Sequence, residues 1–397
     1  MGGDSAHTSR NGRAGVALKI FGDFITEAAT QRLFHALKLN GYQALFVGGC
    51  VRNAVLGMPV NDVDLATDAL PETVTNIAEL AGFRVVPTGM MHGTVTVIAD
   101  DTSHEVTTFR QDMKTDGRHA VVAFCGSIGQ DAARRDFTMN ALYADGHGDV
   151  IDPLGGLPDL LLRRVRFVGD AGARIREDYL RILRFFRFYA LYGDPDKGID
   201  PVGLAACAEA QDGLSGLSPA RIGAEFRKFL AAPDPSPAIA SMAQAGVLAK
   251  ILPGANPQGL GPLIHLESDT PPRWQRRLAV IGGQDVSQRL DLSRAETTSL
   301  SCVRAEIGLT LTPAALGWRL TPSEAEDVVL CRAAMLQMPL QADWQAQIAR
   351  GAGAKIPVTA ADLMPVLTGP ELGKKLRQIE RRWLASDLTL TKAQLLA

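Results

Sequence analysis

The sequence lacks any long hydrophobic run, and none of its apolar stretches approaches the ~20 residues that a membrane-spanning helix needs. Its opening segment, MGGDSAHTSRNGRAG, also lacks the apolar central region of a secretory signal. These absences argue against a membrane partner and favour a cytoplasmic protein. We expect residues 1–22 to form a flexible leader.

Cysteine is scarce and scattered. The five residues include no C-x-x-C pair, and none has a histidine at metal-ligand spacing. This pattern argues against a disulfide scaffold or a Cys/His zinc site and predicts free cytosolic thiols. The cysteines are Cys50, Cys125, Cys207, Cys302 and Cys331.

The sequence has no excess of charge of either sign, because 41 Lys and Arg residues face 43 Asp and Glu residues, for a net charge of −2. A nucleic-acid partner would therefore have to bind through local basic clusters. Apolar residues make up 46% and charged residues 21% of the 397 positions. These values are typical of a globular protein long enough for two or three domains.

Strand and helix signals alternate over about the first 150 residues. Apolar residues at helical spacing predict an early helix, and Pro71 opens another. Alternating segments around a polar turn predict paired strands. The expected elements are a helix (23–40), a strand ending at Gly-Gly (44–49), a short helix (50–57), a strand (61–67), a helix (71–83) and two paired strands (93–100 and 104–110).

Strand signals fade after the turn at residues 152–160, and the later segments show helical spacing. We therefore predict an α+β N-terminal domain, with a small mixed sheet and helices, followed by an all-α remainder. The predicted domains span residues 23–150, 151–232 and 233–397.

The segment VGGCVRNAVLGMPVNDVDLATD, residues 47–68, carries the candidate chemistry. Side chains two apart on a strand point to one face, so Asp62 and Asp64 are expected to project together. Adjacent carboxylates repel unless a cation lies between them, and Mg²⁺ takes one or two carboxylates plus substrate phosphates. Two such ions, ~4 Å apart, can activate a hydroxyl and stabilise a leaving pyrophosphate. The Gly48-Gly49 turn before a helix favours a phosphate group.

The spacing of these residues resembles a known signature. An apolar residue, Gly-Gly, twelve residues and D-V-D-L is similar to the motif of the DNA polymerase β-like nucleotidyltransferase superfamily. Four segments resemble, in order, the motifs of the class II tRNA nucleotidyltransferase and bacterial poly(A) polymerase family: GGCVRN, ARRDFTMNALYAD (133–145), REDYLRILRFFRF (176–188) and RIGAEFRKFL (221–230). Asn53 stands where this family usually has Asp, while Arg52 matches the family motif.

The resemblance implies that Asp62 and Asp64 are catalytic and hold two Mg²⁺ ions with a third acid on the neighbouring strand. Glu105 is the candidate for this third catalytic and metal-binding position, and an exposed strand residue without a ligand role is the alternative. The resemblance also implies a nucleotide-binding set: Gly48, Gly49, Arg52, Arg134, Arg135, Asp136, Asn140, Asp178, Arg181 and Arg184.

Within RRDFTMNAL, the resemblance implies that Arg135 contacts the triphosphate, Asp136 contacts the ribose and Asn140 supports the site. Taken alone, Arg134 and Arg135 could instead be surface charges that open a helix, with Asp136 as its N-cap. A guanidinium suits phosphate because its planar fork donates two parallel hydrogen bonds.

Asp178 and Arg181 are three residues apart, hence neighbours on one face of the expected helix. One interpretation is a surface salt bridge, which is also open to Glu177 with Arg181. The other is a template for the base, because adenine and cytosine both offer an amino donor beside a ring-nitrogen acceptor that a carboxylate and a guanidinium can meet. Guanine and uracil would leave these two groups mismatched.

The polar segment 111–124 resembles the flexible loop of the CCA-adding branch, with a long hairpin as the alternative. The stretch RRVRFVGDAGARIRED (163–178) looks like the CCA type rather than the G-R-R-F-x-x-x-H-V pattern usual in poly(A) polymerases.

RNA contacts would come from basic clusters, with solvated helix faces as the alternative for any one of them. Together the clusters could follow the phosphates of a tRNA acceptor arm. The predicted RNA-binding residues are Arg221, Arg227, Lys228, Lys374, Lys375 and Arg377, with Arg163, Arg164, Arg166, Arg381 and Arg382 as further members of these clusters.

The resemblance implies a CCA-adding tRNA nucleotidyltransferase with a palm-like head (23–150), a helical neck (151–232) and a tRNA-binding body and tail (233–397). Its partners would be the tRNA 3′ end, ATP and CTP. A poly(A) polymerase, or an enzyme that adds only CC or only A, is the nearest alternative. A non-catalytic RNA-binding protein is the other. The sequence leaves the oligomeric state open.

Overall fold

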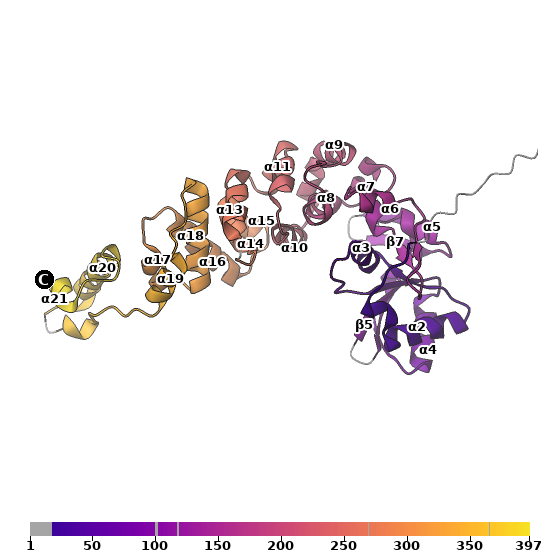
Figure 1. Ribbon diagram of the computed structural model, residues 1–397, viewed down its shortest axis with the longest axis horizontal. Helices are drawn as coiled ribbons and strands as arrows, with labels where there is room; N and C mark the ends of the chain where they lie inside the picture. The colour runs from indigo at the N-terminus through magenta and orange to yellow at the C-terminus, as the bar shows by residue number, and fades with distance from the viewer. Residues whose placement is uncertain (1–17, 100–101, 117–118, 269, 365) are drawn as a thin grey trace, which may run out of the picture. The chain divides into compact units, whose positions relative to one another are not determined.

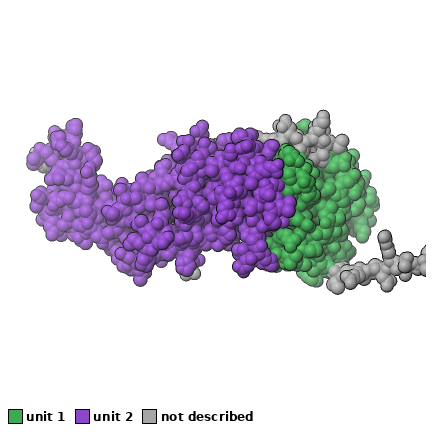
Figure 2. Space-filling view, turned by 90° about the horizontal axis from the view of Figure 1, so that it is seen from above, with its two compact units in different colours: residues 1–178 green, residues 179–397 purple. Residues whose placement is uncertain are grey.

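The computed structural model describes residues 18–99, 102–116, 119–268, 270–364 and 366–397. The chain divides into two compact units, Met1–Asp178 and Tyr179–Ala397, which Figure 2 colours green and purple. The predicted boundary at residue 150 lies inside the first unit, and the finer division of the helical part stays a prediction.

Unit 1 is built on a mixed sheet of seven strands in the order β3-β4-β5-β2-β1-β8-β9, which confirms the predicted fold class. Neighbouring strands are antiparallel except β2 and β5, which run parallel with Asp64 in register with Glu105. The strands are β1 (Ala44–Val47), β2 (Asp64–Thr67), β3 (Arg84–Gly89), β4 (Thr94–Ala99), β5 (Thr102–Thr108), β8 (Tyr143–Ala144) and β9 (Val150–Ile151).

The helices of unit 1 pack on both faces of this sheet. In Figure 1, α2 and α4 lie together beside the sheet, and Phe34 of α2 packs on Phe46 of β1 with 4.6 Å between ring centroids. On the other face, Leu45 and Ala66 pack in one cluster with Ala132 of α5. The helices are α1 (Asp23–Thr26), α2 (Ala28–Leu39), α3 (Gly49–Val55), α4 (Pro71–Leu80), α5 (Ile128–Ala133), α6 (Leu157–Leu161) and α7 (Ala171–Glu177), with short 3₁₀ turns η1 (Met90–His92) and η2 (Thr138–Asn140).

Two expected segments differ in detail. The predicted helix 23–40 is interrupted at Glu27, whose backbone (φ −57°, ψ 128°) separates α1 from α2. The described residues of the segment 111–124 lie in a two-stranded hairpin, as the alternative predicted, and the resemblance to the flexible loop of the CCA-adding branch stays a prediction. The hairpin consists of β6 (Arg110–Asp116) and β7 (His119–Phe124), and residues 117–118 between them lie outside the described residues.

The expected strand 61–67 begins only at Asp64, so Asp62 lies in the preceding loop. The prediction that the strand includes residues 61–63 is therefore wrong, while Asp62 still lies close enough to Asp64 to raise its pKa. The pairing of β1 explains the late start, because β1 ends opposite the beginning of β2 and the chain then turns at Gly48.

Unit 2 is helical, as predicted, and occupies the magenta-to-yellow part of Figure 1. Capping boxes at Ser293 and Thr321 define the starts of two of its long helices. The helices are α8 (Leu180–Tyr192), α9 (Pro201–Glu209), α10 (Pro219–Leu230), α11 (Ser236–Gln244), α12 (Val247–Ile251), α13 (Leu260–Glu267), α14 (Trp274–Ile281), α15 (Val286–Arg289), α16 (Arg294–Ile307), α17 (Pro313–Arg319), α18 (Pro322–Leu336), α19 (Trp344–Ala352), α20 (Gly369–Ala385) and α21 (Lys392–Leu396), with 3₁₀ turns η3 (Gln211–Gly216), η4 (Pro257–Gly259) and η5 (Ala360–Asp362).

The predicted continuous helix through residues 176–188 is broken. Helix α7 ends at Glu177, Asp178 has an extended backbone (φ −154°, ψ 107°), and α8 begins at Leu180. Asp178 and Arg181 therefore do not lie on one helix face, and the prediction that they do is wrong.

A buried ion network joins α13, α14 and α18 in unit 2. The guanidinium of Arg276 lies 2.7 Å from Asp327 Oδ1 and 3.1 Å from Glu267 Oε1. Arg277 Nη2 lies 2.7 Å from Glu267 Oε2, and the same guanidinium donates to backbone carbonyls within residues 230–233, at the end of α10. All four charged side chains are buried, so Glu267 balances two arginines that have little access to water.

Candidate active site

Two of the predicted metal ligands lie side by side on adjacent strands. The parallel register places Asp64, the first residue of β2, next to Glu105 of β5. Asp64 is partly buried, whereas Asp62 and Glu105 are exposed. Because Asp64 lies two positions before Ala66, it faces the layer that contains α5.

The electrostatic surroundings of Asp64 favour a cation. Burial raises the pKa of its carboxyl, the Glu105 carboxylate raises that pKa further, Arg135 opposes the shift, and Asp62 adds to it. Within the described ranges, no group of three or more His, Cys, Asp or Glu side chains is arranged to hold a metal ion. The adjacent pair Asp64 and Glu105 fits a hard cation that takes one or two carboxylates and completes its shell with water or phosphate oxygens.

Gly48 lets the chain pass close to the arginine cluster. Its φ of 72° is a left-handed conformation, and a Cβ at this position would lie 3.3 Å from Arg135 Nη1 and 3.6 Å from the backbone oxygen of Asn140. Its amide donates to the Leu142 carbonyl at 3.0 Å, which ties the turn to the segment that leads into β8. A side chain at position 48 would be strained and would crowd Arg135.

Asp131, on α5, anchors the two arginines that follow this helix. Its carboxylate is 1% exposed. Oδ1 lies 2.7 Å from Arg134 Nη2, and Oδ2 lies 3.1 Å from Arg135 Nη2. The Tyr143 hydroxyl donates to Oδ2 at 2.6 Å and accepts from Arg135 Nε at 3.2 Å. Burial acts to raise the pKa of Asp131, but Arg135 and Arg134 outweigh it and hold that pKa below its ordinary value.

Arg134 and Arg135 do not open a helix, so that alternative is wrong. Helix α5 ends at Ala133, and Arg134 follows it as the C-cap residue. Asp136 does not cap the next turn either, because the N-cap residue of η2 is Phe137. The Asp136 carboxylate instead accepts from the Phe137 amide at 2.8 Å.

A chain of side-chain hydrogen bonds links Arg52 to Asp136. Arg52 Nη1 donates to Asn140 Oδ1, and Asn140 Nδ2 donates to Asp136 Oδ1 at 2.8 Å. Arg52 Nε and Nη2 also donate to Asn53 Oδ1 at 3.2 and 3.0 Å, while Asn53 Nδ2 donates to the Pro59 carbonyl at 2.8 Å. Asn53 thus ties Arg52 to the loop before β2, and the bond to Pro59 is one that the usual carboxylate could not donate.

The remaining nucleotide-binding candidates lie around the break between α7 and α8. Asp178 is the last residue of unit 1, and Arg181 and Arg184 belong to α8 in unit 2. Arg184 Nη1 lies 3.6 Å from Glu225 Oε1 of α10, and its guanidinium carbon lies 5.3 Å from the ring centroid of Phe188. Arg184 therefore also contributes to packing between α8 and α10.

The predicted RNA-binding residues differ in their surroundings. Arg227 lies 3.0 Å from Glu296 and 5.2 Å from the ring centroid of Trp274, so it connects α10 to α14 and α16. The others are exposed or partly exposed: Arg221, Lys228, Lys374, Lys375 and Arg377.

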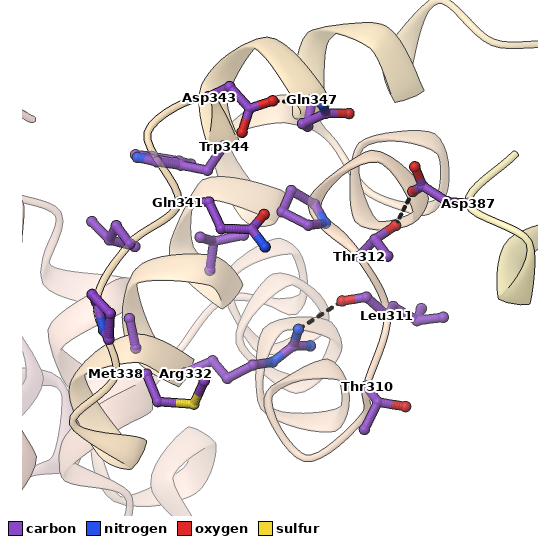
Figure 3. A pocket seen from close by; sticks show the side chains of 15 residues that line it. Thr310, Leu311, Thr312, Arg332, Met338, Gln341, Asp343, Trp344, Gln347 and Asp387 are labelled. Atoms are coloured by element: carbon purple, nitrogen blue, oxygen red, sulfur yellow. Dashed lines mark hydrogen bonds between the residues drawn. The ribbon is translucent and has the colours of Figure 1, made fainter.

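A cavity of 660 Å³ in unit 2 contains none of the predicted site residues (Figure 3). It lies among α17, α18 and α19. Arg332 lines it and donates to the Leu311 carbonyl at 2.7 Å, and the Thr312 hydroxyl donates to Asp387. Because Arg332 and Thr312 already have hydrogen-bond partners within the protein, we do not include the cavity in the candidate site.

Sequence reasoning missed Asp131 and Tyr143. The spacing of Asp131 from Arg134 and Arg135, three and four positions, was an available signal for ion pairs. Tyr143 had no such signal, because it reaches Arg135 only after β8 joins the sheet beside β1.

Comparison with known proteins agrees with this site. Residues 44–166 match the poly A polymerase head domain, and residues 198–258 match the probable RNA and SrmB-binding site of polymerase A. These matches define a nucleotidyltransferase with a head of the poly(A) polymerase type.

Individual relatives narrow the class. The CCA-adding enzyme of Geobacillus thermodenitrificans is 33% identical over 365 residues, which cover 91% of this chain and 83% of that protein. The human mitochondrial CCA tRNA nucleotidyltransferase 1 is 42% identical over 190 residues, 48% of this chain and 44% of that protein. The crystal structure of the Bacillus stearothermophilus CCA-adding enzyme in complex with CTP has a TM-score of 0.70 at 29% identity and covers 91% of this chain and 94% of that one. The chain therefore belongs to the family of CCA-adding tRNA nucleotidyltransferases.

No helix in the described part of the chain is both long and apolar enough to cross a membrane.

Proposed function

We propose that the protein adds C, C and A to the 3′ end of tRNA from CTP and ATP, without a nucleic-acid template and with release of pyrophosphate, in the cytoplasm. The observation that carries the proposal lies in unit 1, where Asp64 and Glu105 are adjacent and Arg135 is close enough to Asp64 to oppose the rise in its pKa. Acids for a cation and an arginine for phosphate are the two requirements of nucleotidyl transfer. Family membership supports the choice of substrates.

Members of this family normally use divalent metal ions, and we propose that Asp62, Asp64 and Glu105 hold two Mg²⁺ ions. Such ions, when bound, lower the pKa of the attacking 3′-hydroxyl and stabilise negative charge on the pyrophosphate. The raised pKa of Asp64 supports this assignment, because a cation would relieve the repulsion among the three carboxylates.

The protein's own groups would bind and orient the nucleotide. Arg135 holds Nη1 near Gly48, where the chain has no side chain to block a triphosphate. We assign Arg134 and Arg135 to the phosphates and Asp136 to the ribose. Asn140 supports Asp136 directly, through its 2.8 Å hydrogen bond. The site is thus ordered before the nucleotide arrives, which lowers the entropic cost of binding.

We assign base selection to Asp178 and Arg181, with Arg184 nearby in α8. Alanine at position 178 or 181 should relax selection toward UTP and GTP, because the mismatched groups that reject these bases would be gone. Each unpaired polar group costs about 1–3 kcal/mol, so the kcat/KM preference should fall by roughly 10-fold or more. Single-nucleotide incorporation with each of the four triphosphates measures this preference. A variant that rejects UTP and GTP as strongly as the parent protein contradicts the assignment.

The experiment that tests the function uses purified protein, Mg²⁺ and tRNA that lacks its 3′ CCA. Each labelled nucleotide is supplied alone and then in combination. Addition that stops after C, C and A supports the proposal. A ladder of A residues would identify a poly(A) polymerase, a stop after CC would identify a partial enzyme, and binding without incorporation would identify an RNA-binding protein.

A further inference from the structure

The Asp131 carboxylate divides its two oxygens between two arginines. Oδ1 accepts from Arg134 Nε at 2.9 Å and from the backbone amide of Arg110 at 3.3 Å, while Oδ2 accepts from Arg135 Nη2 and from the Tyr143 hydroxyl. A carboxylate with this many donors, at 1% exposure, has one well-defined orientation. Each arginine is therefore held by a different oxygen of one fixed group.

This arrangement controls which edge of Arg135 faces the Gly48 turn. Nη2 is bound by Asp131, Nε is bound by the Tyr143 hydroxyl, and the guanidinium carbon lies 5.3 Å from the Tyr143 ring centroid. Nη1 remains on the side of Gly48, where a Cβ would lie 3.3 Å away. Nη1 also donates to the Asn140 carbonyl, at the long distance of 3.5 Å, so the two shorter contacts at Nε and Nη2 and this one together fix the direction of the guanidinium.

The charge balance also suits an anion. Asp131 and its two arginines carry a net formal charge of +1 in a largely buried setting, and the Asp64 carboxylate lies within electrostatic reach of Arg135. Long arginine side chains lose much rotamer freedom when they bind a ligand, and a preformed anchor removes part of that cost in advance.

We infer that Asp131 is a positioning residue for triphosphate binding. Asp131 fixes Arg134 and Arg135 so that Arg135 presents Nη1 at the Gly48 turn. The inference rests on the proposed role of these arginines in binding phosphate. This role differs from that of a carboxylate that only supports the fold. Loss of the Asp131 carboxylate should weaken binding of the triphosphate and spare binding of the base and sugar.

The test compares equilibrium binding of CTP and CMP to the full-length protein with Mg²⁺ present. Asp131→Asn keeps the size of the side chain and removes its charge. This variant should weaken CTP about 10-fold, because hydrogen bonds to charged groups are lost, and should leave CMP almost unchanged. Equal weakening of CTP and CMP, or unchanged CTP affinity in the folded variant, overturns the inference.

Asp159→Asn is the matched control. Asp159 is also a buried aspartate of unit 1 and lies 2.8 Å from Arg166 Nη2. Its ion pairs are with Arg164 and Arg166 rather than with the two arginines that Asp131 holds. Its replacement should leave the ratio of CTP to CMP affinity unchanged.

Tyr143→Phe provides a second variant should Asp131→Asn not fold. It removes the hydroxyl that joins Oδ2 to Arg135 Nε and should lower the CTP to CMP ratio in the same direction by a smaller factor, and an unchanged ratio counts against the inference. The tRNA addition assay is independent of these measurements. A parent protein that prefers CTP to CMP but does not extend tRNA would refute the proposed function and leave the role of Asp131 standing.

Discussion

Replacement of Asp64 by asparagine is expected to abolish nucleotide addition while tRNA binding persists. The change removes one negative charge from the group of acids at the start of β2, where Asp64 lies beside Glu105. A bound metal ion supplies several kcal/mol of transition-state stabilisation, so its loss should lower kcat by roughly 10³-fold or more. Single-turnover incorporation of CTP into tRNA lacking its CCA end measures the rate, and a filter-binding titration measures tRNA affinity.

Asp68→Asn is the control for this experiment, because Asp68 lies just beyond the other end of β2. Its Oδ1 accepts from the Gln43 amide at 2.7 Å, a bond that an asparagine oxygen can still accept. Activity should be retained in this variant. Turnover at the parental rate in Asp64→Asn would remove the metal assignment.

Replacement of Glu267 by alanine is expected to have the largest effect on stability. The change would leave the buried guanidinium groups of Arg276 and Arg277 without the carboxylate that they share. Breaking a buried ion pair from one side costs roughly 3–5 kcal/mol, because an uncompensated charge stays in the interior. For a unit of this size, that cost corresponds to a fall in Tm of roughly 6–20 °C.

Tryptophan fluorescence is the suitable probe, because Trp274, Trp318, Trp344 and Trp383 are the four tryptophans of the chain and all belong to unit 2. Asp212→Ala serves as the control, since Asp212 pairs with Lys250 through side chains that are 83% and 49% exposed. An exposed pair of this kind contributes about 0–1 kcal/mol. Equal shifts in the two variants would show that the buried network carries no special share of the stability.

The strand pattern predicted the segments that carry Asp64 and Glu105, and the role of Glu105 came from the family resemblance. Apolar alternation located the segments around Asp64 and Glu105, and the family signature suggested that they lie on adjacent strands. The observed register places them directly side by side. Local alternation is a strong signal here because one face of each strand is buried.

The positions of Asp62 and Asp178 relative to regular structure were not predictable in the same way. Strand β2 starts where its partner β1 stops, and that limit depends on the turn at Gly48 rather than on residues 61–63. Similarly, helical spacing persists on both sides of Asp178, and only its extended backbone divides α7 from α8. Periodicity reports the type of an element more reliably than its ends.

The partners of Arg134 and Arg135 were predictable only in part. Asp131 could have been paired with Arg134 and Arg135 from spacing alone, although α5 stops before both arginines. Tyr143 could not have been paired with them in this way, because its hydroxyl reaches Asp131 Oδ2 across the interior of unit 1, from a strand that is paired with β1. Tertiary pairing, which no local pattern encodes, completes the cluster.

The parallel pairing of β2 with β5 has a consequence for how the protein acquires its chemistry. The two strands are separated along the chain by α4, β3 and β4, so their pairing closes a long loop and belongs to the slow, non-local events of folding. Under the proposed metal assignment, a nascent or partly folded head would have both acids but no shared affinity for a cation. The onset of Mg²⁺ binding during refolding should accordingly report the moment at which β2 and β5 have paired.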